Sequence, residues 1–155
     1  MKEIILTQGK HAIVDDDDYE WLNRWRWYYS KGYAVRSINI NDQRHTVLLH
    51  RVIMHAMEDK IEVDHVDGNR LDNRWVNLRY VNSQQNSMNR GLYRTNTSGY
   101  KGVHWSKSKN KWEAGLRCKG KGVHLGVIVN IEDAARAYNE AAVKYFGDYA
   151  RLDPL

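Results

Sequence analysis

The chain has almost no cysteine, proline or phenylalanine, with one residue of each in 155. The single cysteine, Cys118, excludes an internal disulfide framework and a zinc site built from several cysteines. This scarcity favours an intracellular protein. Six tryptophans and ten tyrosines supply nearly all the aromatic residues, and such side chains pack well while keeping a polar tip.

Long hydrophobic runs are also missing. The longest aliphatic runs, such as Ile4–Leu6 and Val127–Val129, span three residues, whereas a membrane-spanning helix needs about 20 apolar residues. The N-terminal segment turns polar too early for a secretory signal. With 155 residues and a mean hydropathy of −0.74, the chain has room for one ordinary domain or two small ones, and no membrane partner is expected.

Basic residues are unevenly distributed along the chain. Residues 1–92 contain 13 Lys and Arg against 13 Asp and Glu, so the whole formal net charge of +5 lies in residues 93–155. The stretch from Arg94 to Lys121 holds eight basic residues and one acidic residue, Glu113. Such a stripe beside a neutral remainder is typical of a protein that binds a polyanion, and a merely solvated surface is the alternative.

In the first half, the residue pattern predicts short strands and helices. The acidic run Asp15–Asp18 precedes aromatic residues and fits the first turn of a helix. Tyr, Val, Ile and Thr are frequent in the segments that follow, and Asn41-Asp42 predicts a hairpin turn. The expected elements are strands at 26–40 and 43–50, a helix at 51–57, strands at 62–65 and 78–81, and a helix at 83–90 with Ser83 as its N-cap.

In the second half, the pattern changes after a small polar segment at 91–99, which is the best linker in the chain. Strands are expected at 101–106, 111–117 and 121–127, where apolar and polar residues alternate. A helix is expected at 131–147, capped by Asn130 and ended by Gly147. A helix across one face of this sheet leaves the other face exposed, and the alternation places three side chains there: His104, Arg117 and His124.

The segment VDHVDGNRLDNRWVNLRYVNSQQN carries the strongest chemical motif. Asp64 and His65 end a predicted strand, Asn77 precedes the next strand, and Asn86 lies on the helix after it. Asn77 and Asn86 follow His65 by 12 and 21 residues. This ordered set, together with the Asp-Gly-Asn of the loop and the Asn-Leu-Arg triplet, resembles the HNH family of metal-dependent nucleases over residues 48–92. The resemblance implies a ββα-metal fold that brings Asp64, His65 and Asn86 together.

The residue types suit phosphodiester hydrolysis. His65, neutral near pH 7, can take the proton of an attacking water. The oxygens of Asp64 and Asn86 are hard ligands suited to a divalent metal, Mg²⁺ first and Mn²⁺ as the alternative. The resemblance implies that Asn77 helps to orient His65 and that the products carry 5′-phosphate and 3′-hydroxyl ends. His50 is interpreted mainly as scaffold, with a supporting phosphate contact as the alternative.

Residues 99–153 resemble the Apetala-type, ethylene-response-factor-like DNA-binding domain. The resemblance is carried by YKGV, KWEAGLR, the Leu-Gly before the last helix and the Ala-Ala-x-Ala-Tyr within it. It implies that the sheet enters the major groove, which is wide enough for a β-surface. The positions that match DNA contacts of that family are Lys101, His104, Arg117 and His124. Five lysines are interpreted as phosphate contacts, which position rather than specify, with solvated surface as the alternative for the first two: Lys107, Lys109, Lys111, Lys119 and Lys121.

The sequence therefore predicts an α+β protein with two modules. An HNH nuclease domain is expected at 1–92 with its ββα-metal core at about 48–92, followed by a linker at 93–98 and an Apetala-type domain at 99–155. The arrangement resembles homing-type endonucleases of phages and mobile elements. Double-stranded DNA is the expected partner, without a small-molecule cofactor, and a monomer with one active site is expected to nick. The alternatives are a non-catalytic DNA-binding regulator with a relic nuclease fold and a binder of structured RNA.

Overall fold

The structure, a computed structural model, describes residues 1–57 and 61–155. Its described residues fall into two units, Met1–Ser83 and Gln84–Leu155, and each unit is considered by itself. Both units are mixed α+β with small sheets and few helices, which confirms this part of the prediction. Within the described ranges, no helix is long and apolar enough to cross a membrane.

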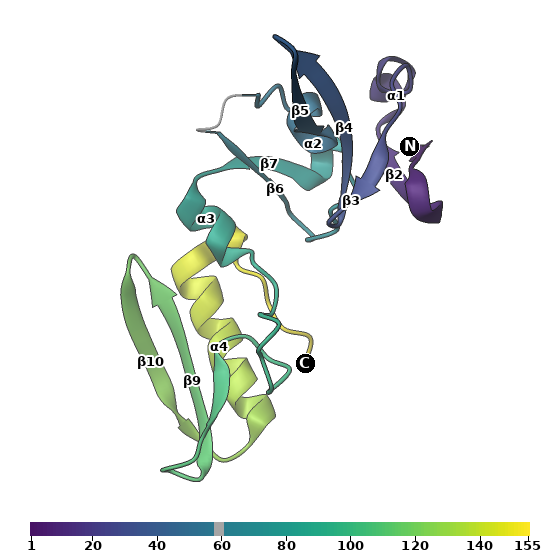
Figure 1. The fold of residues 1–155 in the computed structure, drawn as a ribbon. Coiled ribbons are helices and arrows are strands. Elements are labelled where there is room, and N and C mark those ends of the chain that lie inside the picture. The colour runs from purple at the N-terminus through teal and green to yellow at the C-terminus, as the bar shows by residue number, and fades with distance from the viewer. Residues whose placement is uncertain (58–60) are drawn as a thin grey trace. The chain divides into compact units, whose positions relative to one another are not determined.

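Antiparallel hairpins build the first unit (Figure 1). The strands are β1 (Lys2–Ile5) paired with β2 (His11–Val14), a sheet in the order β3 (Tyr28–Ser30), β4 (Tyr33–Ile40), β5 (Gln43–Leu48), and β6 (Glu62–His65) paired with β7 (Leu78–Val81). The helical segments between them are η1 (Thr7–Gly9), α1 (Asp16–Leu22), α2 (Leu49–Ile53) and η2 (Trp75–Asn77).

Two turns in this unit show how local sequence shapes the sheet. The expected turn at Asn41-Asp42 is present, and both residues have positive φ, 48° and 61°, as a tight two-residue hairpin requires. The single strand expected at 26–40 is instead divided by a second turn at Lys31 and Gly32, whose φ angles are 50° and 92°. The β1–β2 hairpin has no counterpart in the expected elements.

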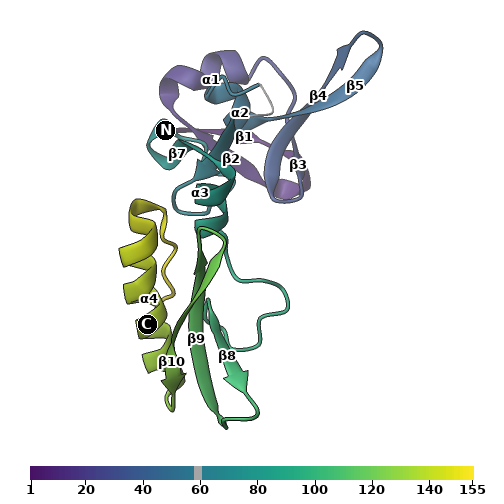
Figure 2. The same ribbon diagram turned by 90° about the vertical axis from the view of Figure 1, so that its left-hand side faces the viewer.

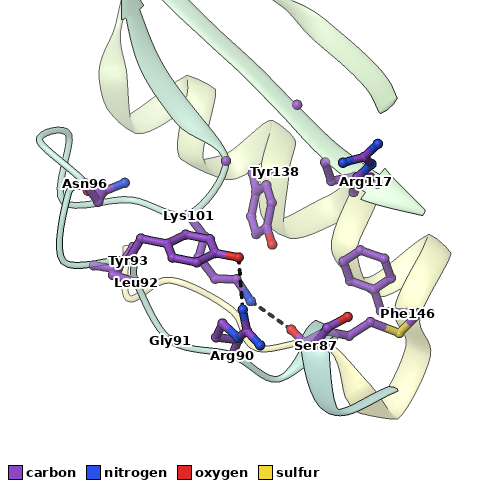
Figure 3. A pocket seen from close by; sticks show the side chains of 14 residues that line it. Ser87, Arg90, Gly91, Leu92, Tyr93, Asn96, Lys101, Arg117, Tyr138 and Phe146 are labelled. Carbon is purple, nitrogen blue, oxygen red and sulfur yellow. Dashed lines mark hydrogen bonds between the residues drawn. The ribbon is translucent and has the colours of Figure 1, made fainter. Parts of the chain in front are cut away.

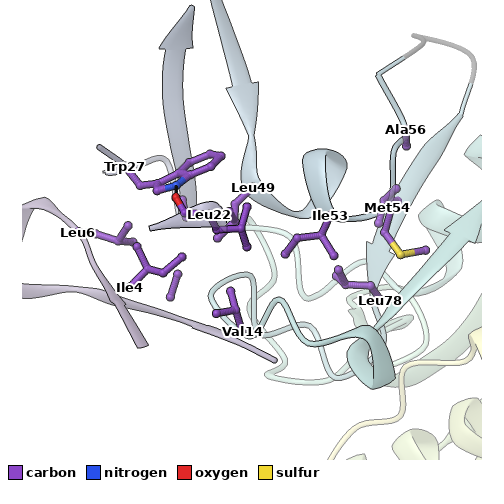
Figure 4. Packing of buried hydrophobic residues seen from close by; sticks show 13 residues of the cluster. Ile4, Leu6, Val14, Leu22, Trp27, Leu49, Ile53, Met54, Ala56 and Leu78 are labelled. Atoms are coloured by element: carbon purple, nitrogen blue, oxygen red, sulfur yellow. Dashed lines mark hydrogen bonds between the residues drawn. The ribbon is translucent and has the colours of Figure 1, made fainter. Parts of the chain in front are cut away.

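One apolar core fills the first unit (Figure 4). Its most buried members come from β1, β2, α1 and α2, and β6 and β7 add Val63 and Leu78. Trp27 lies at one side of the core, where its indole Nε1 donates to the Leu22 carbonyl over 2.9 Å. The strands that carry the predicted nuclease motif are therefore packed against the N-terminal hairpin and helices.

A sheet and one long helix form most of the second unit (Figure 2). Its elements are α3 (Ser83–Met88), which begins at the boundary, a sheet in the order β10 (Lys121–Ile128), β9 (Lys111–Cys118), β8 (Val103–Ser106), then α4 (Ile131–Phe146) and η3 (Gly147–Tyr149).

The helix α4 packs against the sheet through small side chains. Ala134 and Ala135 lie against Val103 and Ala114, while Tyr138 and Phe146 pack with Leu116. The helix begins at the expected cap, because the Asn130 side chain accepts from the backbone N–H of the second and third helical residues. Alternation along β8, β9 and β10 leaves the opposite face of the sheet exposed.

Candidate functional site

Strand β6 presents the adjacent residues Asp64 and His65. It pairs with β7 in a register that sets Asp64 opposite Arg79 and His65 opposite Leu78. The Arg79 guanidinium donates to Asp64 Oδ2 from Nε over 3.2 Å and from Nη2 over 2.9 Å. The Asp64 side chain is only 11% exposed. This ion pair holds the carboxylate at Oδ2.

His65 is buried among polar and aromatic groups. Its Nε2 lies 3.3 Å from the Asn73 side-chain oxygen, and its ring centroid lies 4.9 Å from that of His50 and 6.3 Å from that of Tyr33. Burial lowers the pKa of His65, although the hydrogen bond to Asn73 opposes that change. The imidazole is therefore neutral at pH 7 and able to accept a proton.

His50 lies on α2 and is a direct neighbour of His65. The two rings meet edge to face at an interplanar angle of 70°. Burial, together with the positive charges of His65, Arg51 and Arg70, lowers the pKa of His50 to about 3. Sequence analysis interpreted His50 as scaffold, and the structure places it against the imidazole that carries the predicted chemistry. Its contact with His65 depends on the packing of α2 and could not be found from spacing.

Asn77 holds the backbone of the loop that follows His65. Its side-chain oxygen accepts from the Asp67 N–H over 3.0 Å, and its Nδ2 donates to the Asp72 carbonyl over 2.9 Å. Its own carbonyl accepts from the Val66 N–H over 2.9 Å. Asn77 thus braces the loop at both ends, while the side chain of Asn73 lies within hydrogen-bond distance of the imidazole. Sequence analysis missed Asn73, which is one of several similar asparagines in this loop.

The N-terminal hairpin also supports the loop. Ile13 of β2 donates its N–H to Leu71 and accepts from the N–H of Asn73, each over 2.8 Å. The acidic run contributes as well, since Asp15 Oδ2 accepts from the Trp75 backbone N–H over 2.8 Å and Asp18 accepts from the Trp75 indole. Elements more than 50 residues earlier in the sequence therefore hold the candidate site in shape.

Asn86, the other predicted metal ligand, lies half-buried on α3 in the second unit. Because each unit is considered by itself, the joint placement of Asp64 and Asn86 stays a prediction. The described ranges contain no cluster of three or more His, Cys, Asp or Glu side chains suited to a metal ion. The predicted metal site does not require such a cluster. Its donors are one carboxylate and one amide oxygen, both of which suit a hard divalent cation.

The exposed face of the second unit carries the predicted base contacts. His104, Arg117 and His124 are all exposed, as the alternation predicts. Between the strands, the Glu113 carboxylate contacts Lys109 at 2.8 Å and His104 at 3.4 Å. Hydrogen bonding to Lys109 lowers the pKa of Glu113. The predicted phosphate contacts are exposed too: Lys111, Lys119 and Lys121.

Lys101 differs from the other predicted DNA contacts because its ammonium group is half-buried. Its Nζ donates to the Met88 carbonyl over 2.8 Å, and burial lowers its pKa to about 8. It lines a cavity of about 300 Å³ within the second unit, beside Tyr138, Arg90 and Tyr93 (Figure 3). Lys101 therefore contacts the chain's own backbone in this structure.

Comparison with known proteins identifies the family. The family model for HNH endonuclease matches residues 47–88, which include α2, the β6–β7 hairpin and α3. A protein of Acanthamoeba polyphaga mimivirus, described as an uncharacterized HNH endonuclease, is 33% identical over 144 residues, which cover 92% of this chain and 74% of that protein. The chain belongs to the HNH endonuclease family.

Two further relatives match parts of the chain. Protein 3.8 of Escherichia phage T7 is 41% identical over 59 residues, 38% of this chain and 49% of that protein. An AP2-like ethylene-responsive transcription factor of Arabidopsis thaliana is 40% identical over 65 residues, 41% of this chain and 18% of that protein. No solved structure matches the chain.

Proposed function

We propose that the protein is a metal-dependent DNA endonuclease whose phosphodiester hydrolysis is centred on His65. The observation that supports this most strongly is a buried, neutral imidazole next to a carboxylate that Arg79 fixes, in a chain of the HNH endonuclease family.

In this proposal, His65 acts as general base. It takes a proton from water while the water oxygen bonds to phosphorus and the bond to the 3′-oxygen breaks. The leaving oxygen takes up a proton from solvent, so the ends are a 5′-phosphate and a 3′-hydroxyl. Asn77 keeps the loop behind His65 in place through its bonds to Asp67 and Asp72.

Asp64 and Asn86 would hold the divalent ion, with Mg²⁺ proposed first and Mn²⁺ second. When bound, such an ion supplies positive charge that stabilises the phosphate and the leaving oxygen. Arg79 keeps the Asp64 carboxylate in one position through Oδ2. A fixed first ligand lowers the entropy lost when ion and DNA bind.

We further propose that the second module, at 99–155 after a linker at 93–98, binds double-stranded DNA through the exposed face of β8, β9 and β10. The net positive charge of this part of the chain and the similarity of 65 residues to an AP2-like transcription factor support this. The proposed base contacts on this face are His104, Arg117 and His124, with Lys111, Lys119 and Lys121 on phosphate. Lys101 is proposed as a further contact that would have to exchange its bond to the Met88 carbonyl for one to DNA. Tethering raises the local concentration of the nuclease at DNA, which suits a homing-type enzyme of a phage or mobile element.

Supercoiled plasmid gives the most direct test. With Mg²⁺ the protein should convert it to the nicked circle, and EDTA should stop the reaction. His65→Ala should slow cutting by about 10²-fold or more, the usual contribution of a general base. His45→Ala removes an exposed histidine from β5 and is the matched control that should cut normally.

The outcomes separate the alternatives. If the protein is a regulator with a relic nuclease fold, the wild type and the His65→Ala variant should both bind DNA, and neither should cut it. A binder of structured RNA would release duplex DNA when RNA competes. Cutting by His65→Ala at the wild-type rate would remove His65 from the mechanism.

A further inference from the structure

We propose that the cavity beside Lys101 is a nucleotide-binding site, which takes a phosphate group at Lys101 and Tyr138 and a base at Tyr93. The cavity lies within the second unit. Binding there requires neither His65 nor a metal ion, so the inference goes beyond the proposed hydrolysis.

The cavity has a buried floor and an exposed mouth (Figure 3). Leu116, Tyr138 and Phe146 of its lining are buried, whereas Arg90 and Tyr93 are exposed. The volume of about 300 Å³ is at the lower end of the range for small-molecule sites. The cavity therefore suits a single nucleotide rather than a longer segment of nucleic acid.

The lining of the cavity is positively charged. Among the described residues that line it, Arg90, Lys101 and Arg117 are basic and none is Asp or Glu. Burial lowers the pKa of Lys101 to about 8, although Asp153 opposes that change. Asp153 Oδ2 accepts from the Lys101 backbone N–H over 2.6 Å and is not part of the lining. An anion in the cavity would favour the charged form of this half-buried ammonium group.

Lys101 and Tyr138 offer hydrogen-bond donors to such an anion. The Lys101 ammonium has three N–H groups, and one of them donates to the Met88 carbonyl over 2.8 Å. A phosphate taken by the others leaves this bond in place, unlike a contact with duplex DNA.

The hydroxyl of Tyr138 is the second donor. The residue is only 4% exposed, and its ring centroid lies 5.9 Å from Lys101 Nζ. Within the part of the chain that the structure describes, no group bonds this hydroxyl. Burial raises the pKa of Tyr138 to about 12, so the phenol keeps its proton and can donate it. Because an unpaired polar group on a buried residue is unfavourable, a phosphate oxygen would stabilise it.

Tyr93 supplies a ring for the base. It is 67% exposed, yet Arg90 holds it, since Arg90 Nη1 donates to the Tyr93 hydroxyl over 3.2 Å and the guanidinium carbon lies 5.7 Å from the ring centroid. An exposed aromatic ring of this kind is a stacking surface for a nucleobase. Inorganic phosphate would use the donors but not the ring, so the two features together favour a nucleotide.

Titration calorimetry of the full chain with 2′-deoxyadenosine 5′-monophosphate in EDTA tests the site. We expect saturable binding. Inorganic phosphate and deoxyadenosine should each bind at least about tenfold more weakly, because each lacks one of the two kinds of contact. Absence of saturable binding, or equal binding of inorganic phosphate, would overturn the proposal. The His65→Ala variant should bind the nucleotide like the wild type, so this test is separable from failure of the proposed hydrolysis.

Variants assign the binding to this cavity. Tyr138→Phe removes only the hydroxyl, so the melting temperature should not fall while the nucleotide affinity drops about tenfold. Lys101→Met should lower the affinity by about 10- to 100-fold, as for a hydrogen bond to a charged group. Tyr93→Ala should lower it about tenfold, and Tyr93→Phe, which keeps the ring, should retain most of it. Tyr145→Phe and Lys144→Met, at exposed positions of α4, are the matched controls.

The variants also define what would contradict the site. Wild-type affinity in both Tyr138→Phe and Lys101→Met would place the nucleotide elsewhere, and a Tyr138→Phe protein that loses stability would show that its hydroxyl has a structural role instead. If Lys101→Met does not fold, Tyr138→Phe and the two Tyr93 variants still decide the matter.

Competition identifies the source of the nucleotide. A short single strand with a 5′-phosphate and the same strand with a 5′-hydroxyl are each tested for displacement of the bound monophosphate. Displacement by the phosphorylated strand alone assigns the site to a strand end, and displacement by both assigns it to a nucleotide within a strand. Displacement by neither assigns it to a free nucleotide.

Discussion

Buried polar side chains organise the candidate site. Apart from His50, which packs against the His65 ring, each one has a hydrogen-bond partner that replaces water, and leaving such a group unpaired costs about 1–3 kcal/mol. Spacing from His65 was enough to select Asp64 and Asn77, whereas nothing in the loop sequence separates Asn73 from its neighbours. The residues concerned are His50, His65, Asp72, Asn73 and Asn77.

Asp72 gives a prediction for stability against pH. Its side chain is 5% exposed and bonds Arg74 Nη2 over 2.5 Å, and hydrogen bonding to Arg74 lowers its pKa. Asp72→Asn should lower the free energy of unfolding by about 2 kcal/mol at pH 7, the usual value for a hydrogen bond to a charged group.

The sign of the pH dependence follows from that lowered pKa. The unfolded carboxyl binds its proton at a higher pH than the folded one, so the contribution is full above about pH 4 and is lost as the pH falls through the folded pKa. Urea unfolding at several pH values should show the wild-type advantage shrinking below pH 4. Asp42→Asn, on an exposed turn, should stay within about 0.5 kcal/mol of wild type throughout. A difference that persists unchanged at pH 2 would contradict the assignment to this carboxyl.

Secondary-structure elements differ in how far their sequences define them. The helix expected at 131–147 is observed as α4, Ile131–Phe146, because helical periodicity and both caps agree. The strand expected at 26–40 is two strands, since tyrosines on both sides of Lys31-Gly32 favour β-structure and conceal the turn. The hairpin of β1 and β2 was not expected; its strands pair locally, and Ile13 of β2 also bonds Leu71 and Asn73 of the distant loop.

Gly102 tests how closely α4 approaches the sheet. It has a φ of +64°, and a Cβ there would meet the Gly115 carbonyl and the Tyr138 ring. Gly102→Ala should therefore lower the free energy of unfolding by about 1–3 kcal/mol or more, from backbone strain alone. Denaturant unfolding measures this. Gly122→Ala, where an added Cβ meets nothing within 4 Å, is the control, and equal stability of the two variants would rule out the close approach.

At the scale of the whole molecule, charge is divided along the chain. Residues 1–92 are neutral in sum, while the net positive charge lies in residues 93–155. This division suits a chain in which one part carries the chemistry and the other attracts a polyanion. The mimivirus relative shows that the chain belongs to the HNH endonuclease family. The DNA-binding role of the second module remains a proposal.

Salt dependence measures the proposed phosphate contacts. Replacing Lys111 and Lys119 by alanine should make the plot of log Kobs against log salt shallower by about 2, since each phosphate contact contributes about 0.9 to the slope. The measurement is binding of the full chain to duplex DNA from low to moderate salt. Lys144→Ala removes an exposed lysine from α4 and should leave the slope unchanged. An unaltered slope in the double variant would remove these lysines from the interface.

The sequence by itself determined the nuclease family, the residues of its motif, the capped helix α4 and the exposure of His104, Arg117 and His124. These features depend on spacing, periodicity and capping, which are local properties of the chain. Only the tertiary structure decided that His50 and Asn73 contact His65, that Arg79 pairs with Asp64, and that β2 supports the loop. The reason is physical: such contacts join segments distant in sequence, and they exist only once the apolar core has packed those segments together.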